Sequence, residues 1–426
     1  MRLTDDEKAM LDGAQGPAKQ RAMDLLMRYG RALGAERLVE VNNVASTFNV
    51  TTAGVREVAV NKGFDAVFSE YNLDSDEVVE MPQAAAPTCQ LIQGMDPYHP
   101  ELNRLAPDNV ELQKQSEAFF KARGVSIMAT CAPYQVGNVP KLGEHCAWME
   151  SSAVVLCNSL FGARTNTEGR ESTGAASITR RIPYWGYHLP ENRLGTHLVD
   201  VEVPVEDMLE WGLLGYHVGD AVGEQIAVLR GIGRAPSMIM LKHFGAAGAS
   251  SGGIEMYHVP GVTPEAPTLE AAFGGRAPRE TLRYGAAERR RAYENLNAST
   301  STREVDFVML GCPHNSMEQL RTCARLLDGK RLNAGTAMWV FTPRALREEA
   351  QAEGLLEPIL AAGAHVLSDT CPAISRLMPK GTKVACTDSA KQAHYLPPLT
   401  GVQCWFGAVD DCVRAGITGR WEGDLP

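Results

Sequence analysis

One stretch decides the fold: VDFVMLGCPHNSMEQLRTCARLL, residues 305–327. Residues 305–310 are apolar or β-branched with a single aspartate, a composition that predicts a short buried strand. Ser316 is followed three residues later by Gln319, a capping-box pattern that predicts a helix running to about Leu327. The stretch therefore predicts a strand, a cysteine-containing turn and a capped helix in succession.

The residues that follow repeat this pattern. Residues 337–341 predict a second strand, and Thr342 with Pro343 supplies an N-cap and an N1 proline for a helix that runs to about residue 362. Residues 365–367 predict a third strand. Strands that alternate with helices predict a parallel sheet, whose ligands bind beyond the carboxyl ends of the strands.

Two cysteines follow strands of this expected sheet. Cys312 comes directly after the first strand and Cys371 after the third. The positive end of the following helix stabilises a thiolate there, although a single such cysteine is equally well explained as a small buried side chain. Two thiols at one sheet edge favour a shared ligand. Cys131 follows a strand predicted over residues 125–128 and is a candidate third ligand.

Three cysteines without a fourth suit an iron-sulfur cluster with an open iron position better than a closed structural zinc site. A catalytic zinc remains an alternative, although no HExxH pair is present. Cys386, which lies near Lys391 in the sequence, is the alternative to Cys131 as third ligand. The other cysteines are expected to be structural: Cys89, Cys146, Cys157, Cys323, Cys404 and Cys412.

Size and charge limit the function further. A chain of 426 residues predicts two or three lobes, and its formal net charge of -10 argues against nucleic acid as a partner. The basic run 289–291 has acidic neighbours, Glu288 and Glu294, and is expected to be a solvated helix face. We find no apolar span of roughly 18 residues and no basic signal peptide, so we expect no membrane association and a cytoplasmic location.

Two regions are expected within the chain. Residues 1–295 would form an N-terminal α/β region, possibly of two lobes, that binds substrate and cluster, and residues 296–426 a C-terminal α/β lobe with the GCPH and DTCP motifs. Residues 241–253 predict a strand followed by small residues, and residues 279–297 predict a helix. The glycine run 245–253 could cradle a phosphate, but tight packing is favoured because the run itself contains no basic residue.

Eight runs of sequence, taken together, resemble the catalytic subunit of the aconitase X family, in the family's order over nearly the whole chain. They are ATCAPYQVGNVP (129–140), GEHCAWMESSAV (143–154), GARTNTEGR (162–170), YWGYHLPENR (184–193), KHFGAAGASSGG (242–253), GCPHNS (311–316), SDTCPA (368–373) and TDSAKQAHY (387–395).

The resemblance implies an iron-sulfur hydro-lyase with an aconitase-like α/β core of two to three lobes and mainly parallel sheets. It implies that Cys131, Cys312 and Cys371 are the cluster ligands and that Ser389 and Lys391 are catalytic. The implied substrate-binding residues are Ala45, Ser46, Thr47, Gln93, Gly94, Glu150, Ser151 and Arg164. The CxxC pair of aconitase itself is missing.

Known members of the family dehydrate cis-3-hydroxy-L-proline in bacteria or 5-phosphomevalonate in archaea, and we take the imino acid as the leading substrate. Dehydration requires a base for the α-proton and a Lewis acid for the departing hydroxide. The substrate carboxylate requires donors, for which Lys391, Arg164 and Ser46 are candidates, with backbone amides near Gly94. A non-catalytic metal or redox-sensing protein is the alternative from another class.

The resemblance also implies a partner. In the aconitase superfamily a catalytic serine base lies on a mobile swivel domain, either fused or made as a separate small subunit. The sequence ends at WEGDLP, shortly after the apolar segment 404–406, which is too short a distance for a further domain of about 50 residues. We therefore expect a small swivel-domain subunit to supply the base, so that the chain alone would be nearly inactive.

Overall fold

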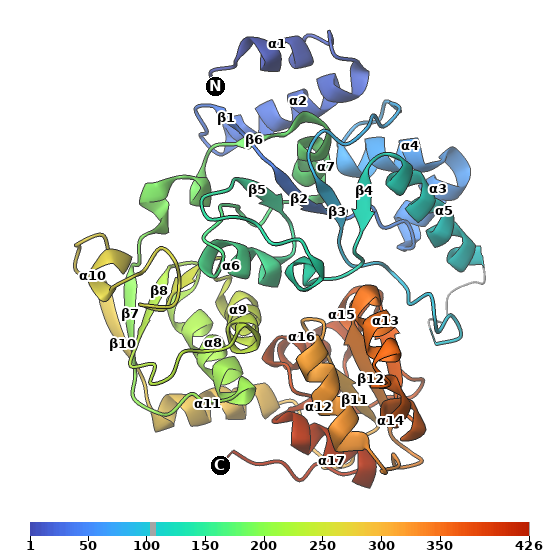
Figure 1. The fold of residues 1–426 in the computed structure, drawn as a ribbon, viewed down its shortest axis with the longest axis vertical. Coiled ribbons are helices and arrows are strands. Elements are labelled where there is room, and N and C mark those ends of the chain that lie inside the picture. The colour runs from blue at the N-terminus through green and yellow to red at the C-terminus, as the bar shows by residue number, and fades with distance from the viewer. Residues whose placement is uncertain (103–107, 426) are drawn as a thin grey trace. The chain divides into compact units, whose positions relative to one another are not determined.

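The computed structural model describes residues 1–102 and 108–425, which form two compact units (Figure 1). Unit 1 comprises the described residues of Met1–Met95 and Leu105–Leu194, and unit 2 those of Asp96–Arg104 and Gly195–Pro426. The chain passes from one unit to the other after Leu194, within the region 1–295 that the sequence predicts as possibly two lobes.

The core of unit 1 is a four-stranded sheet in which every neighbouring pair is parallel. Its order is β4 (Val125–Ile127), β3 (Thr88–Gln90), β2 (Asn43–Ser46) and β5 (Cys146–Trp148). The strand predicted over residues 125–128 is confirmed. Two buried apolar clusters surround the sheet, one with Phe48 and Phe120 and the other with Trp148.

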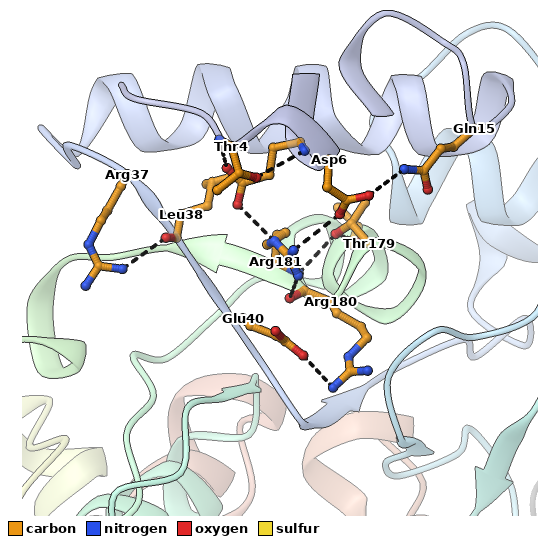
Figure 2. A network of polar contacts seen from close by, with 11 residues as sticks. Thr4, Asp6, Gln15, Arg37, Leu38, Glu40, Thr179, Arg180 and Arg181 are labelled. Carbon is orange, nitrogen blue, oxygen red and sulfur yellow. Dashed lines mark hydrogen bonds and ion pairs between the residues drawn. The ribbon is translucent and has the colours of Figure 1, made fainter. Parts of the chain in front are cut away.

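Helix α1 makes polar contacts within unit 1 in addition to the packing of Met10 in its apolar core. Helix α1 (Asp5–Leu11) begins with a capping box between Thr4 and Glu7. The guanidinium of Arg181 donates to Glu7 Oε1 at 2.9 Å and pairs with Asp6 Oδ2 at 3.3 Å, as Figure 2 shows for Asp6 and Arg181. Arg180 pairs with Glu40 at 2.6 Å in the same network.

Other elements complete unit 1. The antiparallel pair is β1 (Leu38–Glu40) with β6 (Arg181–Pro183). The helices are α2 (Pro17–Ala32), α3 (Ala53–Lys62), α4 (Phe64–Val67), the π-helix η1 (Phe68–Asn72), α5 (Asp108–Ala122), α6 (Ser151–Ser159) and α7 (Arg170–Thr179), with short 3₁₀ turns at Pro133–Val136, Gly186–His188 and Pro190–Arg193.

Unit 2 begins with a second parallel sheet, of order β10 (Glu280–Tyr284), β7 (His197–Val201), β8 (Ala227–Arg230) and β9 (Tyr257–His258). Its helices are α8 (Met208–Val222), α9 (Met238–Gly252), α10 (Leu269–Ala272) and α11 (Ala286–Asn297). Two predictions are wrong here. Residues 241–253 lie in a helix rather than a strand, and residues 279–297 contain a strand before their helix.

The small residues of α9 explain the first error. A Cβ atom at Gly252 would lie 1.8 Å from Gly219 O, and one at Gly215 would lie 2.3 Å from Phe244 O. Helices α8 and α9 therefore pack backbone to backbone, which requires glycine on both. The glycine run serves tight packing, because the amides within this helix interior are used by the helix and are not arranged as a phosphate nest.

The second sheet of unit 2 has the order β13 (His365–Ser368), β12 (Ala337–Thr342), β11 (Phe307–Leu310), β14 (Val384–Thr387) and β15 (Gln403–Phe406), and all neighbours are parallel. Its helices are α12 (Met317–Leu327), α13 (Arg344–Ala352), α14 (Leu356–Ala361), α15 (Pro372–Ser375), α16 (Ala390–Thr400) and α17 (Val409–Thr418) (Figure 1).

This sheet confirms the predicted α/β alternation. The capping box of Ser316 and Gln319 is present at the start of α12. The helix predicted after Thr342 differs in two ways: Pro343 is the N-cap residue, and the helix is interrupted after Ala352. In the part of the chain that the structure describes, no helix has the length and apolar character needed to cross a membrane.

Candidate functional site

Most of the predicted substrate-binding residues lie at the carboxyl edge of the unit 1 sheet. Because its strands are parallel, the segments that follow β2, β3, β4 and β5 emerge at the same edge. These segments carry Ser46, Thr47, Gln93, Gly94, Cys131, Glu150 and Ser151. Ala45 lies inside β2 and packs in the core, so it offers no side chain to a ligand.

The Ser46–Thr47 loop is held by neighbouring side chains. The buried Ser46 hydroxyl lies 2.8 Å from Thr173 Oγ1 of α7. Gln90 at the end of β3 accepts a hydrogen bond from Phe48 N at 2.6 Å and donates to Thr47 Oγ1 at 3.3 Å. These contacts fix the loop without any ligand.

Gly94 lies where no side chain fits. A Cβ atom there would lie 1.7 Å from Thr51 Oγ1. Thr51 itself donates through its hydroxyl to Asn49 Oδ1 at 2.8 Å. The loop after β3 therefore approaches the loop after β2 with its backbone, which leaves the main-chain groups near Gly94 as its means of contacting a ligand.

The loop after β5 leads into α6. Glu150 is the N-cap residue of this helix, and its carboxylate accepts a hydrogen bond from Ser152 Oγ at 2.9 Å. Ser151 is the first helical residue and is partly exposed. The amides of this first turn lie at the carboxyl edge of the sheet, where they are suited to bind an anionic group.

Arg164 lies at the other end of β5. It bridges to His145, which precedes β5, and its Nη1 donates to His188 O at 3.3 Å. The nearby rings of His145 and His188 are joined Nδ1 to Nδ1 at 2.9 Å. Burial and the charges of Arg164, Arg37 and Arg193 lower the pKa of His145 to about 4. Arg164 is thus separated from the other predicted residues.

Arg170 is a cation at the carboxyl edge that sequence reasoning missed. It is the first residue of α7, and its guanidinium donates to Asn72 Oδ1 at 3.2 Å and Asn49 O at 3.3 Å. Its Nη2 is buried and has no hydrogen-bond partner among the described residues. Burial lowers its pKa to about 10, so the group stays charged at neutral pH.

The second sheet of unit 2 brings together the other predicted residues. Cys312 follows β11, Cys371 follows β13, and Ser389 with Lys391 follows β14, all at one carboxyl edge. The two cysteine loops are joined directly, since His314 Nε2 lies 3.1 Å from Thr370 O.

Ser389 and Lys391 differ in what they can do. The Ser389 hydroxyl accepts a hydrogen bond from Gln392 N at 3.1 Å and is the N-cap of α16. Its position therefore fixes the first turn of that helix. Lys391 lies in this turn and is partly exposed.

Sequence reasoning also missed five buried polar side chains at this edge. Each has a side-chain atom without a hydrogen-bond partner in the described part of the chain: Asn315 Nδ2, Ser368 Oγ, Thr370 Oγ1, Asp388 Oδ1, and both Gln392 Oε1 and Nε2. Several lie within motifs quoted from the sequence, but neither their burial nor their missing partners are visible there. Buried polar groups that lack partners in the protein point to an absent ligand or water.

Lys242 of α9 contacts the loop that follows β11 at the same edge. It is 1% exposed, and its Nζ donates to His314 O at 3.0 Å and Gln319 Oε1 at 2.6 Å. A buried ammonium requires such partners. This contact joins α9, a helix of the first sheet of unit 2, to the loop that carries Cys312.

The three predicted cluster ligands differ from the other cysteines. All ten are buried, but Cys131, Cys312 and Cys371 are 8%, 6% and 8% exposed, whereas the other seven are 2% exposed or less. Burial raises the pKa of Cys89 and of Cys323 to about 12. Such thiols remain protonated and are poor metal ligands.

Backbone strain also lies beside the predicted ligands. Ala129 and Asp369 have left-handed φ angles of 51° and 68° and each lies two residues before a predicted ligand cysteine, while Gly311, with φ 101°, directly precedes Cys312. Non-glycine residues in this conformation cost about 1–3 kcal/mol and cluster at functional sites. Cys386 lies instead within β14, in the apolar core.

These features fit a thiolate-bound cluster. Among the described residues, no three His, Cys, Asp or Glu side chains are spaced to hold a metal by themselves. Cys131 belongs to unit 1, and Cys312 and Cys371 belong to unit 2. Each is a thiol at the end of a strand, at an edge where other predicted site residues lie.

Parallel sheets with thiols and polar groups beyond the carboxyl ends of their strands are typical of α/β proteins that bind ligands at such edges. Family models described as the first, second and third domains of aconitase X match residues 1–191, 195–294 and 305–418. The chain belongs to the aconitase X family, whose α/β fold of parallel sheets it has.

Relatives define the reaction class. The chain is 34% identical over 422 residues to the phosphomevalonate dehydratase large subunit of Methanocaldococcus jannaschii, which covers 97% of this chain and 100% of that protein. It is 34% identical over 437 residues to the cis-3-hydroxy-L-proline dehydratase of Pseudomonas aeruginosa, covering 100% of this chain and 71% of the relative.

A crystal structure of Thermococcus kodakaraensis aconitase X in its holo-form matches 98% of this chain and 100% of its own, with a TM-score of 0.82 and 29% identity. The chain is therefore a dehydratase, a hydro-lyase of the aconitase X family. The alternative of a non-catalytic sensor is set aside.

Proposed function

We propose that this chain dehydrates cis-3-hydroxy-L-proline to Δ1-pyrroline-2-carboxylate. The observation that carries this choice is the charge of a cavity in unit 2. Its lining contains four carboxylates and, in the described part of the chain, no Lys or Arg. An imino acid has a cationic nitrogen that such a lining attracts, whereas the phosphate of 5-phosphomevalonate would be repelled.

The proposed cluster ligands are Cys131, Cys312 and Cys371, with the number of irons left open. When bound, an iron-sulfur cluster would supply a Lewis acid for the departing hydroxide. The greater exposure of these thiols and their positions at strand ends support the assignment.

The substrate carboxylate would be bound by residues of this chain. Ser46 and Lys391 remain candidate donors. Arg170 takes the place of Arg164, because Arg170 lies at the carboxyl edge and its Nη2 has no hydrogen-bond partner there within the described residues. The α7 residue Thr173, one turn after Arg170, contacts Ser46 and so joins the two candidates.

The base is proposed to come from a partner. Relatives named as large subunits imply a second subunit. We propose that a small swivel-domain subunit supplies a serine that removes the α-proton. Closure of that subunit would exclude water and place the base.

Dehydration of 5-phosphomevalonate is the second candidate function. It is favoured by the relative from Methanocaldococcus jannaschii, whose whole length is covered by the match. The charge of the cavity is the observation against it.

A direct assay separates the two functions. The chain, produced anaerobically with the small subunit, is given each substrate, and product formation is followed by absorbance and mass spectrometry. We expect turnover of the imino acid. Turnover of 5-phosphomevalonate alone would refute the proposal.

A further inference from the structure

A cavity lies at the switch point of the second sheet in unit 2. Strand β11 is followed by β12 on one side, and its other neighbour, β14, is followed by β15 on the opposite side. Open parallel sheets bind ligands at such a point, beyond the carboxyl ends of the strands. The cavity there has a volume of about 230 Å³, enough for a small molecule.

Two unpartnered polar atoms line this cavity. Asn315, in the loop after β11, and Asp388, directly after β14, are among its lining residues and are 1% and 3% exposed. Within the described residues, Asn315 Nδ2 has no acceptor and Asp388 Oδ1 has no donor. A buried polar group without a partner destabilises the protein, so both atoms favour the binding of a ligand.

The Asp388 carboxylate lacks a direct counter-ion. No ion pair joins it to any residue that the structure describes, and Lys242, the nearby cation, donates to His314 O and Gln319 Oε1. Burial raises the pKa of Asp388 to about 6, against the lowering effect of Lys242. A ligand cation beside Asp388 Oδ1 would offset the cost of this buried charge.

The rest of the lining matches a small cationic molecule with an apolar body. The apolar side chains are those of Met208, Ile239, Met240 and Val409. Three further carboxylates, those of Glu206, Asp207 and Glu318, lie on exposed residues of the lining. They would attract a cation toward Asp388, whereas the apolar side chains suit the methylenes of a ring.

We infer that this cavity binds the substrate's cationic nitrogen, with Asp388 accepting a hydrogen bond from it and Asn315 donating one to a substrate oxygen. The inference rests on the proposed function and adds two residues to it. Asp388 would make the enzyme specific for an imino acid, because 5-phosphomevalonate has no cationic nitrogen.

The test compares two ligands that differ at one atom. L-Proline has the cationic nitrogen, and (S)-tetrahydrofuran-2-carboxylate has an ether oxygen in its place. Binding of each to the anaerobically prepared complex is measured by calorimetry for the wild type, for Asp388→Asn, and for Asp328→Asn, an exposed control at the end of α12.

The wild type and the control are expected to prefer L-proline by about 10–100-fold, the range of a hydrogen bond to a charged group. Asp388→Asn should reduce this preference to about threefold or less while its affinity for the ether stays unchanged, which also shows that the variant is folded. Asp388→Glu, which keeps the charge, should retain part of the preference.

An undiminished preference in Asp388→Asn would overturn the inference and leave the proposed function intact. If Asp388→Asn fails to fold, loss of the preference in Asp388→Glu by as much as in a neutral variant such as Asp388→Ser would also overturn it. A wild type that binds 5-phosphomevalonate and not L-proline would refute the proposed substrate, and the inference with it.

Discussion

The two carboxyl edges differ in how their polar groups are satisfied. At the edge in unit 1, Ser46 is paired with Thr173, and Gln90 contacts both Phe48 and Thr47. At the edge of the second sheet in unit 2, Asn315 and Asp388 have side-chain atoms that no described residue satisfies. The first edge is organised before a ligand arrives, while the second depends on a ligand for completion. In unit 1, Arg170 Nη2 also lacks a hydrogen-bond partner among the described residues.

The thiols should give the largest effect. Replacement of Cys131, Cys312 or Cys371 by Ser is expected to abolish the cluster's visible absorption and the activity together, because each thiolate is needed to hold the metal. Cys404→Ala, a change in the core, should keep both. Absorption spectra and iron analysis measure the outcome. A cluster that survives Cys131→Ser but not Cys386→Ser would show that the third ligand was assigned wrongly.

The next largest effect on activity is expected from substitution of Arg170, compared with substitution of Arg164. Arg170→Gln is expected to lower kcat/KM by about 10–100-fold, since it removes a charged hydrogen-bond donor from the carboxyl edge. Arg164→Gln should have a much smaller effect, because Arg164 lies at the other end of β5. Steady-state kinetics of both variants provide the comparison. Equal losses would place Arg164 in the site after all.

Two glycine substitutions test the packing of α8 against α9 in unit 2. Gly252→Ala is expected to destabilise the chain by about 1–3 kcal/mol, because its Cβ would meet the backbone of α8. A Cβ atom at Gly233 meets nothing within 4 Å, so Gly233→Ala is the matched control. Thermal unfolding of both is the measurement. Equal stability of the two variants would contradict the described α8–α9 packing.

The smallest expected effect is one of pH. Burial raises the pKa of Asp388 to about 6, and only its ionised form binds a cation. Affinity for L-proline should therefore fall as pH drops below 6, approaching tenfold per pH unit. The other charged groups around Asp388 are Lys242, Glu206, Asp207 and Glu318. Calorimetry at several pH values should show this decline in the wild type and none in Asp388→Asn.

The sequence predicted what depends on local pattern. The strands and capped helix around residues 305–327 follow from β-branched runs and the Ser316–Gln319 capping box, both of which act over a few residues. The sequence predicts a strand and a loop where helix α9 lies, because the glycines of this segment are poor local signals for a helix. Their role becomes visible only when α8 is packed against them.

The candidate site likewise contains residues that local sequence patterns predict and residues that only tertiary packing reveals. The placement of Cys312 and Cys371 at one edge followed from strand positions alone. The sequence does not point to Asp388 and Arg170, because they stand out only by being buried with a side-chain atom that lacks a partner among the described residues. Both properties arise from tertiary packing. Arg164 and Arg170 lie in one short run of sequence but at different ends of β5, because the segment between them runs parallel to that strand, with bridges from Arg164 to His145 and from Thr167 to Trp148.

The metal content of the chain purified under anaerobic conditions tests the cluster assignment most directly. Iron and acid-labile sulfide are measured together with the visible spectrum. We expect both elements and a broad absorption that disappears in the variants of Cys131, Cys312 and Cys371. Zinc alone, with no labile sulfide, would contradict the assignment.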